Sequence, residues 1–196
     1  MNYIPSNISS SFLSFFKPTV HWGSAVTLFF VVSGFLITGI LLRCRDTINS
    51  TKQSAGFTLR RFYIRRFIRI SPIYYLTLAV TAIGFEQVRD VFFLHLTYTT
   101  NIMVLIRGEW EQTSSHFWTL SMEEQFYLIY PFIILLLPTK YLLRAILITI
   151  ILAPLSRFIG YGLGLNSVQL TVLLLASLDA LGCGALLASY TQSRTV

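Results

Sequence analysis

Charged side chains are scarce in this 196-residue chain: Asp, Glu, Lys and Arg together make up 12% of it. A soluble domain carries roughly a quarter. Hydrophobic residues make up 54% of the chain and occur in long blocks. This pattern excludes an ordinary soluble globular domain and is typical of a polytopic membrane protein. We therefore predict an all-α fold, a bundle of about five or six transmembrane helices.

Cysteine is also scarce. Cys44 and Cys183 are the only two, and they lie too far apart for a metal-ligand spacing, so we interpret them as free thiols. The chain has no phosphate-binding glycine loop and no GxSxG elbow. The first residues lack the basic region of a signal peptide. We expect no metal and no nucleic-acid partner, and the polar residues inside hydrophobic segments are the candidates for chemistry.

Six hydrophobic segments follow one another along the chain. The first, residues 22–42, is free of charge over 21 residues, about 31 Å of helix at roughly 1.5 Å per residue, enough to cross a bilayer. The others cover residues 70–85, 91–106, 117–137, 141–155 and 168–190, with Pro154 as a helix breaker and the glycine-rich residues 156–166 as a loop. We predict one partial transmembrane domain at 22–190, an extramembrane tail or loop at 1–21 and a tail at 191–196.

The basic residues are concentrated in one place. Of the 15 Lys and Arg residues, eight lie between Arg43 and Arg69. By the positive-inside rule this connection faces the cytoplasm. The chain is therefore predicted to be a multi-pass protein of the cell membrane, with residues 43–69 as a basic cytoplasmic loop and residues 1–21 on the outer side.

Two adjacent glutamates, Glu123 and Glu124, interrupt the fourth segment. An unpaired charge inside a membrane costs at least about 2.5–3.5 kcal/mol, so such residues are functional candidates. At helical spacing a polar stripe falls near one face and predicts a helix beside a wet cavity; it consists of His116, Thr119, Glu123, Tyr127 and Tyr130. Alternatively, both glutamates lie at the membrane interface and cap the helix, with Ser121 and Glu124 in a capping arrangement.

Arginines and an aspartate form two further candidate sites. Arg65, Arg66 and Arg69 could bind a polyphosphate through their guanidinium groups, although juxtamembrane basic clusters also bind anionic lipid headgroups. Asp179 lies among small residues that permit close helix packing. Arg157 or an arginine of the cluster could neutralise it, and both a structural ion pair and a catalytic role remain open.

Four stretches together resemble the membrane-bound acyltransferase-3 family, which moves acyl groups onto cell-surface glycans and related acceptors. They are AVTLFFVVSGFLITGILL, FYIRRFIRISPIYYL, HFWTLSMEEQFYLIYP and LDALGCGALLA. The first is similar to the family's FFxxSG helix, and the second to its RxxR segment. The matching residues are Phe29, Phe30, Ser33, Gly34, Arg66, Arg69, Pro72, Tyr75, Trp118, Leu120, Glu123, Gln125, Phe126, Tyr127, Pro131, Asp179 and Gly182.

The resemblance implies an integral membrane O-acyltransferase. It would transfer an acyl group, expected to be acetyl, from acyl-CoA to a hydroxyl of a cell-surface carbohydrate, with no permanently bound cofactor. Glu123 and His116 are the catalytic candidates. The residues expected at the acyl-CoA site are Arg65, Arg66, Arg69, Phe29, Phe30, Ser33 and Gly34. Glu124, Asp179 and Arg157 are expected to contact the site residues and hold them in position, without touching the donor themselves.

The sequence also departs from the family. The family's opening helix carries an arginine and the histidine taken as the catalytic base; here His21 would lie in the loop that follows it. Thr27 stands where the family often has Asp, and Ser177 where it usually has Arg. We therefore expect a truncated member with little or no activity alone, to which a second polypeptide could supply the missing helices. Whether the chain is an enzyme stays open.

Two rival functions remain at this point. The first is a non-catalytic membrane remnant, a subunit that binds lipid or the spans of a partner. The second is a proton-coupled transporter that would use the intramembrane Glu and Asp as a relay, although no repeat pattern favours it.

Overall fold

The computed structural model describes residues 22–51, 53–110, 113–114 and 116–193. In this part of the chain all regular structure is helical, which confirms the predicted all-α class. The long helices are α2 (Trp22–Thr51), α3 (Ala55–Gly84), α7 (Phe117–Leu136), α8 (Thr139–Gly162) and α10 (Leu178–Ser193). The short ones are α4 (Glu86–Asp90), α5 (Phe92–Leu96), α6 (Thr100–Arg107), α9 (Ser167–Val172) and the 3-10 helix η1 (Leu174–Ser177). The predicted tail or loop at 1–21, with His21, lies outside the described residues.

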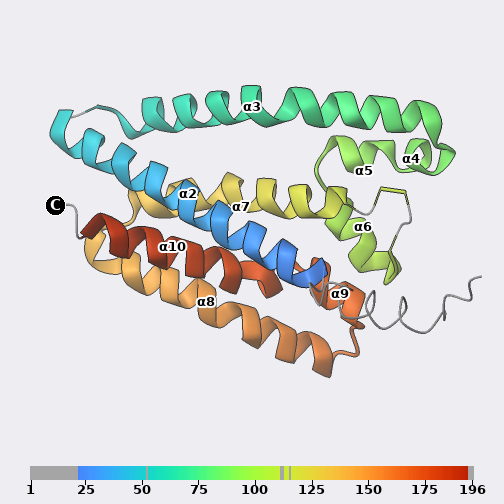
Figure 1. Cartoon of the computed structure of the whole chain (residues 1–196). Coiled ribbons are helices and arrows are strands. Elements are labelled where there is room, and N and C mark those ends of the chain that lie inside the picture. Colours follow the sequence, from blue (N-terminus) through green and yellow to red (C-terminus); the bar gives the residue numbers. More distant parts are fainter. Residues whose placement is uncertain (1–21, 52, 111–112, 115, 194–196) are drawn as a thin grey trace, which may run out of the picture.

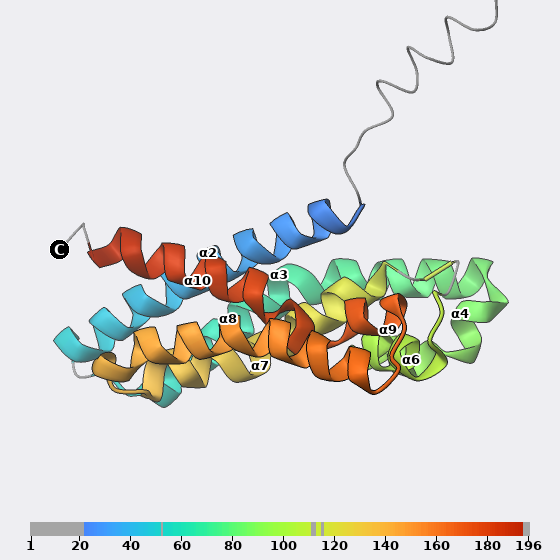
Figure 2. The same ribbon diagram turned by 90° about the horizontal axis from the view of Figure 1, so that it is seen from below.

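The five long helices form an elongated bundle, and the short helices α4, α5, α6 and α9 gather at one end of it (Figures 1 and 2). α2 makes its most extensive contacts with α10 and also packs on α7, while α8 covers the other side of α10. α3 runs along one edge and touches α2 and α7 only sparsely. The space between α2, α3 and α7 is where the candidate site lies.

The backbones of α2 and α10 approach each other very closely. A Cβ atom on Gly34 would collide with the carbonyl group of Leu181, and one on Gly184 would collide with the carbonyl oxygen of Val31. Small residues at a crossing allow helix backbones to touch, as is common in membrane proteins. These two glycines therefore set the position of α10 against α2.

Four helical stretches are long and apolar enough to cross a membrane: Ala25–Thr51, Ala55–Gly84, Thr139–Gly162 and Leu174–Gln192. The sequence predicted about five or six spans. α7 is not among the four because its Glu-Glu-Gln triplet lowers the mean hydropathy. The segment at 91–106 is not one helix but contains α5 and most of α6, with a turn at Tyr98, whose φ is 55°.

The predicted basic loop at 43–69 is wrong as a description of the backbone. α2 continues to Thr51 and α3 begins at Ala55, so most of the basic residues are helical. Arg, Lys and Gln are good helix formers, and the polar character of the stretch therefore did not indicate a loop. Arg45 shows why the extension of α2 is useful: it donates to the carbonyl oxygen of Ile134 at 2.7 Å and to Thr139 Oγ1 at 2.9 Å. This links α2 to the connection between α7 and α8.

The end of the chain also differs from the expectation. α8 continues through Pro154 to Gly162, because a proline removes only one backbone hydrogen bond and the helix packs against α10. The apolar run at 168–190 is interrupted: α9 ends at Val172, and η1 precedes α10. Arg157 stabilises this interruption by donating to the carbonyl oxygen of Ala176 as well as to Asp179.

Candidate functional site

A cavity of about 730 Å³ opens between α2, α3 and α7. Its wall is apolar along α2 and basic along α3, and α7 contributes a carboxylate and a phenol. The lining residues that the argument needs are Phe29, Ser33, Cys44, Arg61, Arg65, Arg66, Arg69, Glu123 and Tyr127. We call this space the first cavity.

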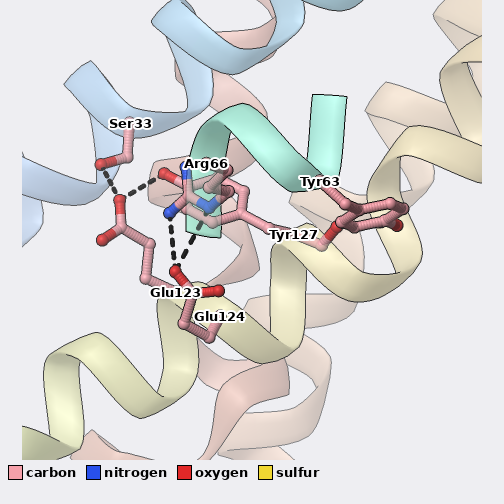
Figure 3. A network of polar contacts seen from close by, with 6 residues as sticks. All are labelled: Ser33, Tyr63, Arg66, Glu123, Glu124 and Tyr127. Carbon is pink, nitrogen blue, oxygen red and sulfur yellow. Dashed lines mark hydrogen bonds and ion pairs between the residues drawn. The ribbon is translucent and has the colours of Figure 1, made fainter. Parts of the chain in front are cut away.

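A buried carboxylate lies at the wall of this cavity. Glu123 is 5% exposed, and its Oε1 accepts hydrogen bonds from the hydroxyl of Ser33 on α2 and from the hydroxyl of Tyr127 on α7 (Figure 3). Tyr127 reaches Glu123 because residues four apart lie on the same face of a helix. The two hydroxyls hold the carboxylate in place and satisfy it away from bulk water.

The neighbouring glutamate has a different partner. Glu124 Oε1 accepts from Arg66 Nε at 3.2 Å and from Arg66 Nη2 at 3.0 Å. The guanidinium carbon of Arg66 also lies 3.2 Å from the centre of the Tyr127 ring, a cation–π contact. Figure 3 shows how Arg66 of α3 thereby joins the two consecutive glutamates of α7 into one network. Glu124 and Tyr127 thus fix the position of the Arg66 guanidinium group.

Three other arginines line the first cavity with no counter-ion among the described residues. Arg61, Arg65 and Arg69 are spaced four residues apart on α3, all three are exposed, and no described residue forms an ion pair or hydrogen bond with their side chains. Like charges at this spacing destabilise a helix. An anion in the cavity would relieve this repulsion. We call Arg61, Arg65 and Arg69 the arginine stripe. The sequence analysis did not name Arg61 as a site residue, although its spacing of four residues from Arg65 could have indicated it.

A second cavity of about 1060 Å³ is lined by four other predicted residues. Phe30, His116, Asp179 and Arg157 line it, so His116 and Glu123 open to different cavities. Of the two partners considered for Asp179, the structure selects Arg157, whose Nη2 lies 2.7 Å from Asp179 Oδ2.

Gly34 lines neither cavity; it packs against Leu181. His116 lies at the start of α7 and is exposed overall, but its ring centre lies 4.3 Å from that of Phe117, and the partial burial of the imidazole lowers the pKa of His116.

Two amide side chains near the site form a pair that the sequence analysis did not predict, although it named Gln125 as a motif residue. Asn101 and Gln125 exchange two hydrogen bonds, of 3.2 and 2.8 Å, and Gln125 also donates to the carbonyl oxygen of Tyr98 at 3.0 Å. They join α6 to α7. The sequence did offer a signal for this pair, because Asn101 and Gln125 are polar residues inside the hydrophobic segments 91–106 and 117–137. Among the described residues, no group of three or more His, Cys, Asp or Glu is arranged to hold a metal ion.

Comparison with known proteins agrees with the motifs in these helices. Residues 1–191 match the family model described as "Acyltransferase domain". The chain belongs to the acyltransferase-3 family. It is similar to an uncharacterized protein of Haemophilus influenzae, with 31% identity over 58% of this chain and 50% of that protein. It is also similar to the peptidoglycan O-acetyltransferase OatA of Listeria monocytogenes, with 29% identity over 79% of this chain and 25% of that protein.

A Staphylococcus aureus protein with a provisional O-acetyltransferase name is 31% identical over 57% of this chain and 20% of its own length. The matched regions thus span half or less of these acyltransferase-3 relatives. No solved structure shows a significant match to the chain. With four candidate spans and this family membership, the chain is a membrane protein of an acyltransferase family.

Proposed function

We propose that this chain acts in O-acyl transfer from acyl-CoA to a hydroxyl of a cell-surface carbohydrate, in the cell membrane. The observation that carries the proposal is the first cavity, in which an arginine stripe and a held carboxylate face the same space. The names of the Listeria and Staphylococcus relatives support acetyl as the acyl group, and that of the Listeria protein supports a glycan acceptor.

The arginine stripe is suited to the donor. Acyl-CoA carries several phosphates, and guanidinium groups bind phosphate through paired hydrogen bonds. Arg61, Arg65 and Arg69 line the first cavity and form no ion pair with any described residue, so they can bind the phosphates of the donor. The apolar wall of α2 at Phe29 suits the uncharged part of the donor. Acyl-CoA is found in the cytoplasm. We therefore assign the N-terminal half of α3, which carries these arginines, to the cytoplasmic side of the membrane, in keeping with the positive-inside rule.

The reaction needs a base and a way to stabilise charge. The acceptor oxygen attacks the thioester carbonyl carbon, a C–O bond forms, the C–S bond breaks, and the proton of the hydroxyl ends on the departing sulfur. Glu123 is our candidate to take that proton on the donor side, and His116 is the candidate on the side of the second cavity. Arg66, held by Glu124, lies beside Tyr127 and supplies positive charge near the developing oxyanion.

A second function is supported by the same arginines. A non-catalytic membrane protein could use the exposed stripe to bind anionic lipid headgroups, which attract basic segments at membrane surfaces. The two functions differ in what they require of the cavity. Headgroup binding depends on the arginine charges alone, whereas acyl-CoA binding also requires the enclosed wall formed by α2 and α7.

The test is CoA binding to the purified protein in detergent micelles, measured by calorimetry. We expect replacement of Arg65 and Arg69 by Ala to weaken CoA binding by about tenfold for each arginine, or about 1.4 kcal/mol. Arg60→Ala is the matched control, because Arg60 is an exposed arginine of the same helix that lines neither cavity. Unchanged CoA affinity in both variants, together with weaker binding to anionic vesicles in the Arg65 and Arg69 variants, would favour headgroup binding.

A further inference from the structure

The second cavity has one aromatic wall and one polar wall. α2, α7, α8 and α10 surround it, together with α9, η1 and the loop after α6. The aromatic wall consists of Phe30, Trp110, His116 and Trp118; the polar wall consists of Thr27, Arg157, Thr171, Ser177 and Asp179. Cys183 lies on the same lining.

The aromatic wall presents a partly open platform. The ring centres of Trp110 and Trp118 are 5.6 Å apart at 45°, and Trp118 meets Phe30 edge-on at 6.2 Å. Trp118 is 7% exposed and is held by this packing, whereas Trp110 is 40% exposed. Indole combines a large apolar face with a polar edge, and such rings suit ligands that also have one apolar and one polar side.

The polar wall is electrically balanced. Arg157 and Asp179 are paired at 2.7 Å, and their side chains keep 45% and 30% of their surface exposed. The pair therefore offers adjacent donors and acceptors, which the hydroxyls of Ser177 and Thr171 supplement. The first cavity instead has four arginines and one glutamate. A phosphate in the second cavity would meet the Asp179 carboxylate, so the balance favours an uncharged ligand with many hydroxyls.

We propose that the second cavity binds the neutral sugar unit of the acceptor, with the ring stacked on Trp110 and hydroxyls bonded to the Arg157–Asp179 pair. This inference rests on the proposed function, since it supplies the acceptor half of the same reaction. The two cavities meet at α2, where Phe29 lines the first and the adjacent Phe30 lines the second, with ring centres 5.9 Å apart. The two cavities therefore lie against neighbouring faces of the same helix, separated by these two rings.

The two cysteines allow each cavity to be tested separately. Cys44 lines the first cavity and Cys183 the second, and both are free thiols. The experiment measures the rate at which N-ethylmaleimide alkylates each cysteine in the detergent-solubilised chain, by peptide mass spectrometry. The probes are CoA and the neutral disaccharides cellobiose and N,N′-diacetylchitobiose. At a probe concentration about ten times its Kd, mass action predicts alkylation about tenfold slower at a covered thiol.

We expect at least one disaccharide to slow alkylation of Cys183 and leave Cys44 unchanged. Trp110→Ala should abolish this protection, and Trp110→Phe should retain part of it because a smaller aromatic platform remains. Phe93→Ala, which truncates a 77% exposed aromatic outside both cavities, is the matched control and should keep full protection.

Three results would overturn the inference: no protection of Cys183 by either disaccharide, equal protection in Trp110→Ala, or protection of Cys183 by CoA. The Cys44 measurement keeps the two proposals apart. Protection of Cys44 by CoA with no sugar effect at Cys183 refutes the acceptor site and leaves the donor site standing. Sugar protection of Cys183 without CoA protection of Cys44 supports the sugar site and refutes the acyl-CoA site.

Discussion

The hydroxyl of Ser33 donates a hydrogen bond to the carboxylate of Glu123, a residue 90 positions later in the chain. The bond joins α2 to α7 inside the protein, and Tyr127 donates to the same carboxylate oxygen. A buried carboxylate in an apolar protein is stable only when its oxygens find donors. Two of the stretches that resemble motifs of the acyltransferase-3 family therefore meet at this one side chain.

The Ser33–Glu123 bond should be measurable as a coupling energy. We predict that Ser33→Ala and Glu123→Gln are not additive, with a coupling of about 1–3 kcal/mol, because Ser33→Ala removes the donor of a buried bond and Glu123→Gln replaces its carboxylate acceptor by a neutral amide. Thermal or denaturant unfolding in detergent of the wild-type chain, both single variants and the double variant provides the cycle. Additivity within about 0.3–0.5 kcal/mol, as for independent sites, would contradict the bond.

Arg66 should not be replaceable by lysine. Arg66→Lys keeps the charge but loses the two-nitrogen contact with Glu124 and the stacking on Tyr127. We predict a loss of about 1–2 kcal/mol in the free energy of unfolding, since a partly buried charged hydrogen bond and a cation–π contact are both weakened. Arg60→Lys on the same helix should stay within about 0.5 kcal/mol. Equal effects of the two substitutions would show that the network adds nothing to stability.

Two glycines of α2 should respond oppositely to alanine. Gly34→Ala forces a methyl group into the backbone of Leu181, and overpacking of this kind costs about 1–3 kcal/mol. Gly39 has nothing within 4 Å of the added carbon, so Gly39→Ala should stabilise the chain by up to about 1 kcal/mol through higher helix propensity. The melting temperatures of both variants in detergent test this. A neutral Gly34→Ala would mean that α10 does not approach α2 as closely as described.

His116 should make the chain less stable in mild acid. Partial burial lowers the pKa of His116 below its ordinary 6.5, so the unfolded chain takes up a proton at a higher pH than the folded one. Stability is then complete above 6.5 and falls as the pH drops from 6.5 toward the folded pKa. We predict that His116→Asn loses less Tm between about pH 7 and pH 5 than the wild type. Parallel Tm curves for the two proteins would refute this.

The fold class and one contact of the candidate site could be predicted from the sequence. The low charge and long apolar blocks determined the helical membrane class, because apolar runs of this length are compatible with burial in lipid only as helices. Helical spacing also put Glu123 and Tyr127 on one face, where the structure has them. The polarity of the basic residues 43–69 could not show that most of them are helical, because good helix formers and loop residues can be equally polar.

The sequence by itself therefore determined the helical membrane class and the shared helix face of Glu123 and Tyr127, since these depend on composition and local spacing. Only the tertiary structure decided the partners: Arg66 with Glu124, Arg157 with Asp179, and Glu123 and His116 in separate cavities. Those choices depend on where whole helices lie. For α10 against α2, the backbone contact at Gly34 and Gly184 sets that position, and no local pattern in either helix specifies the residue across it.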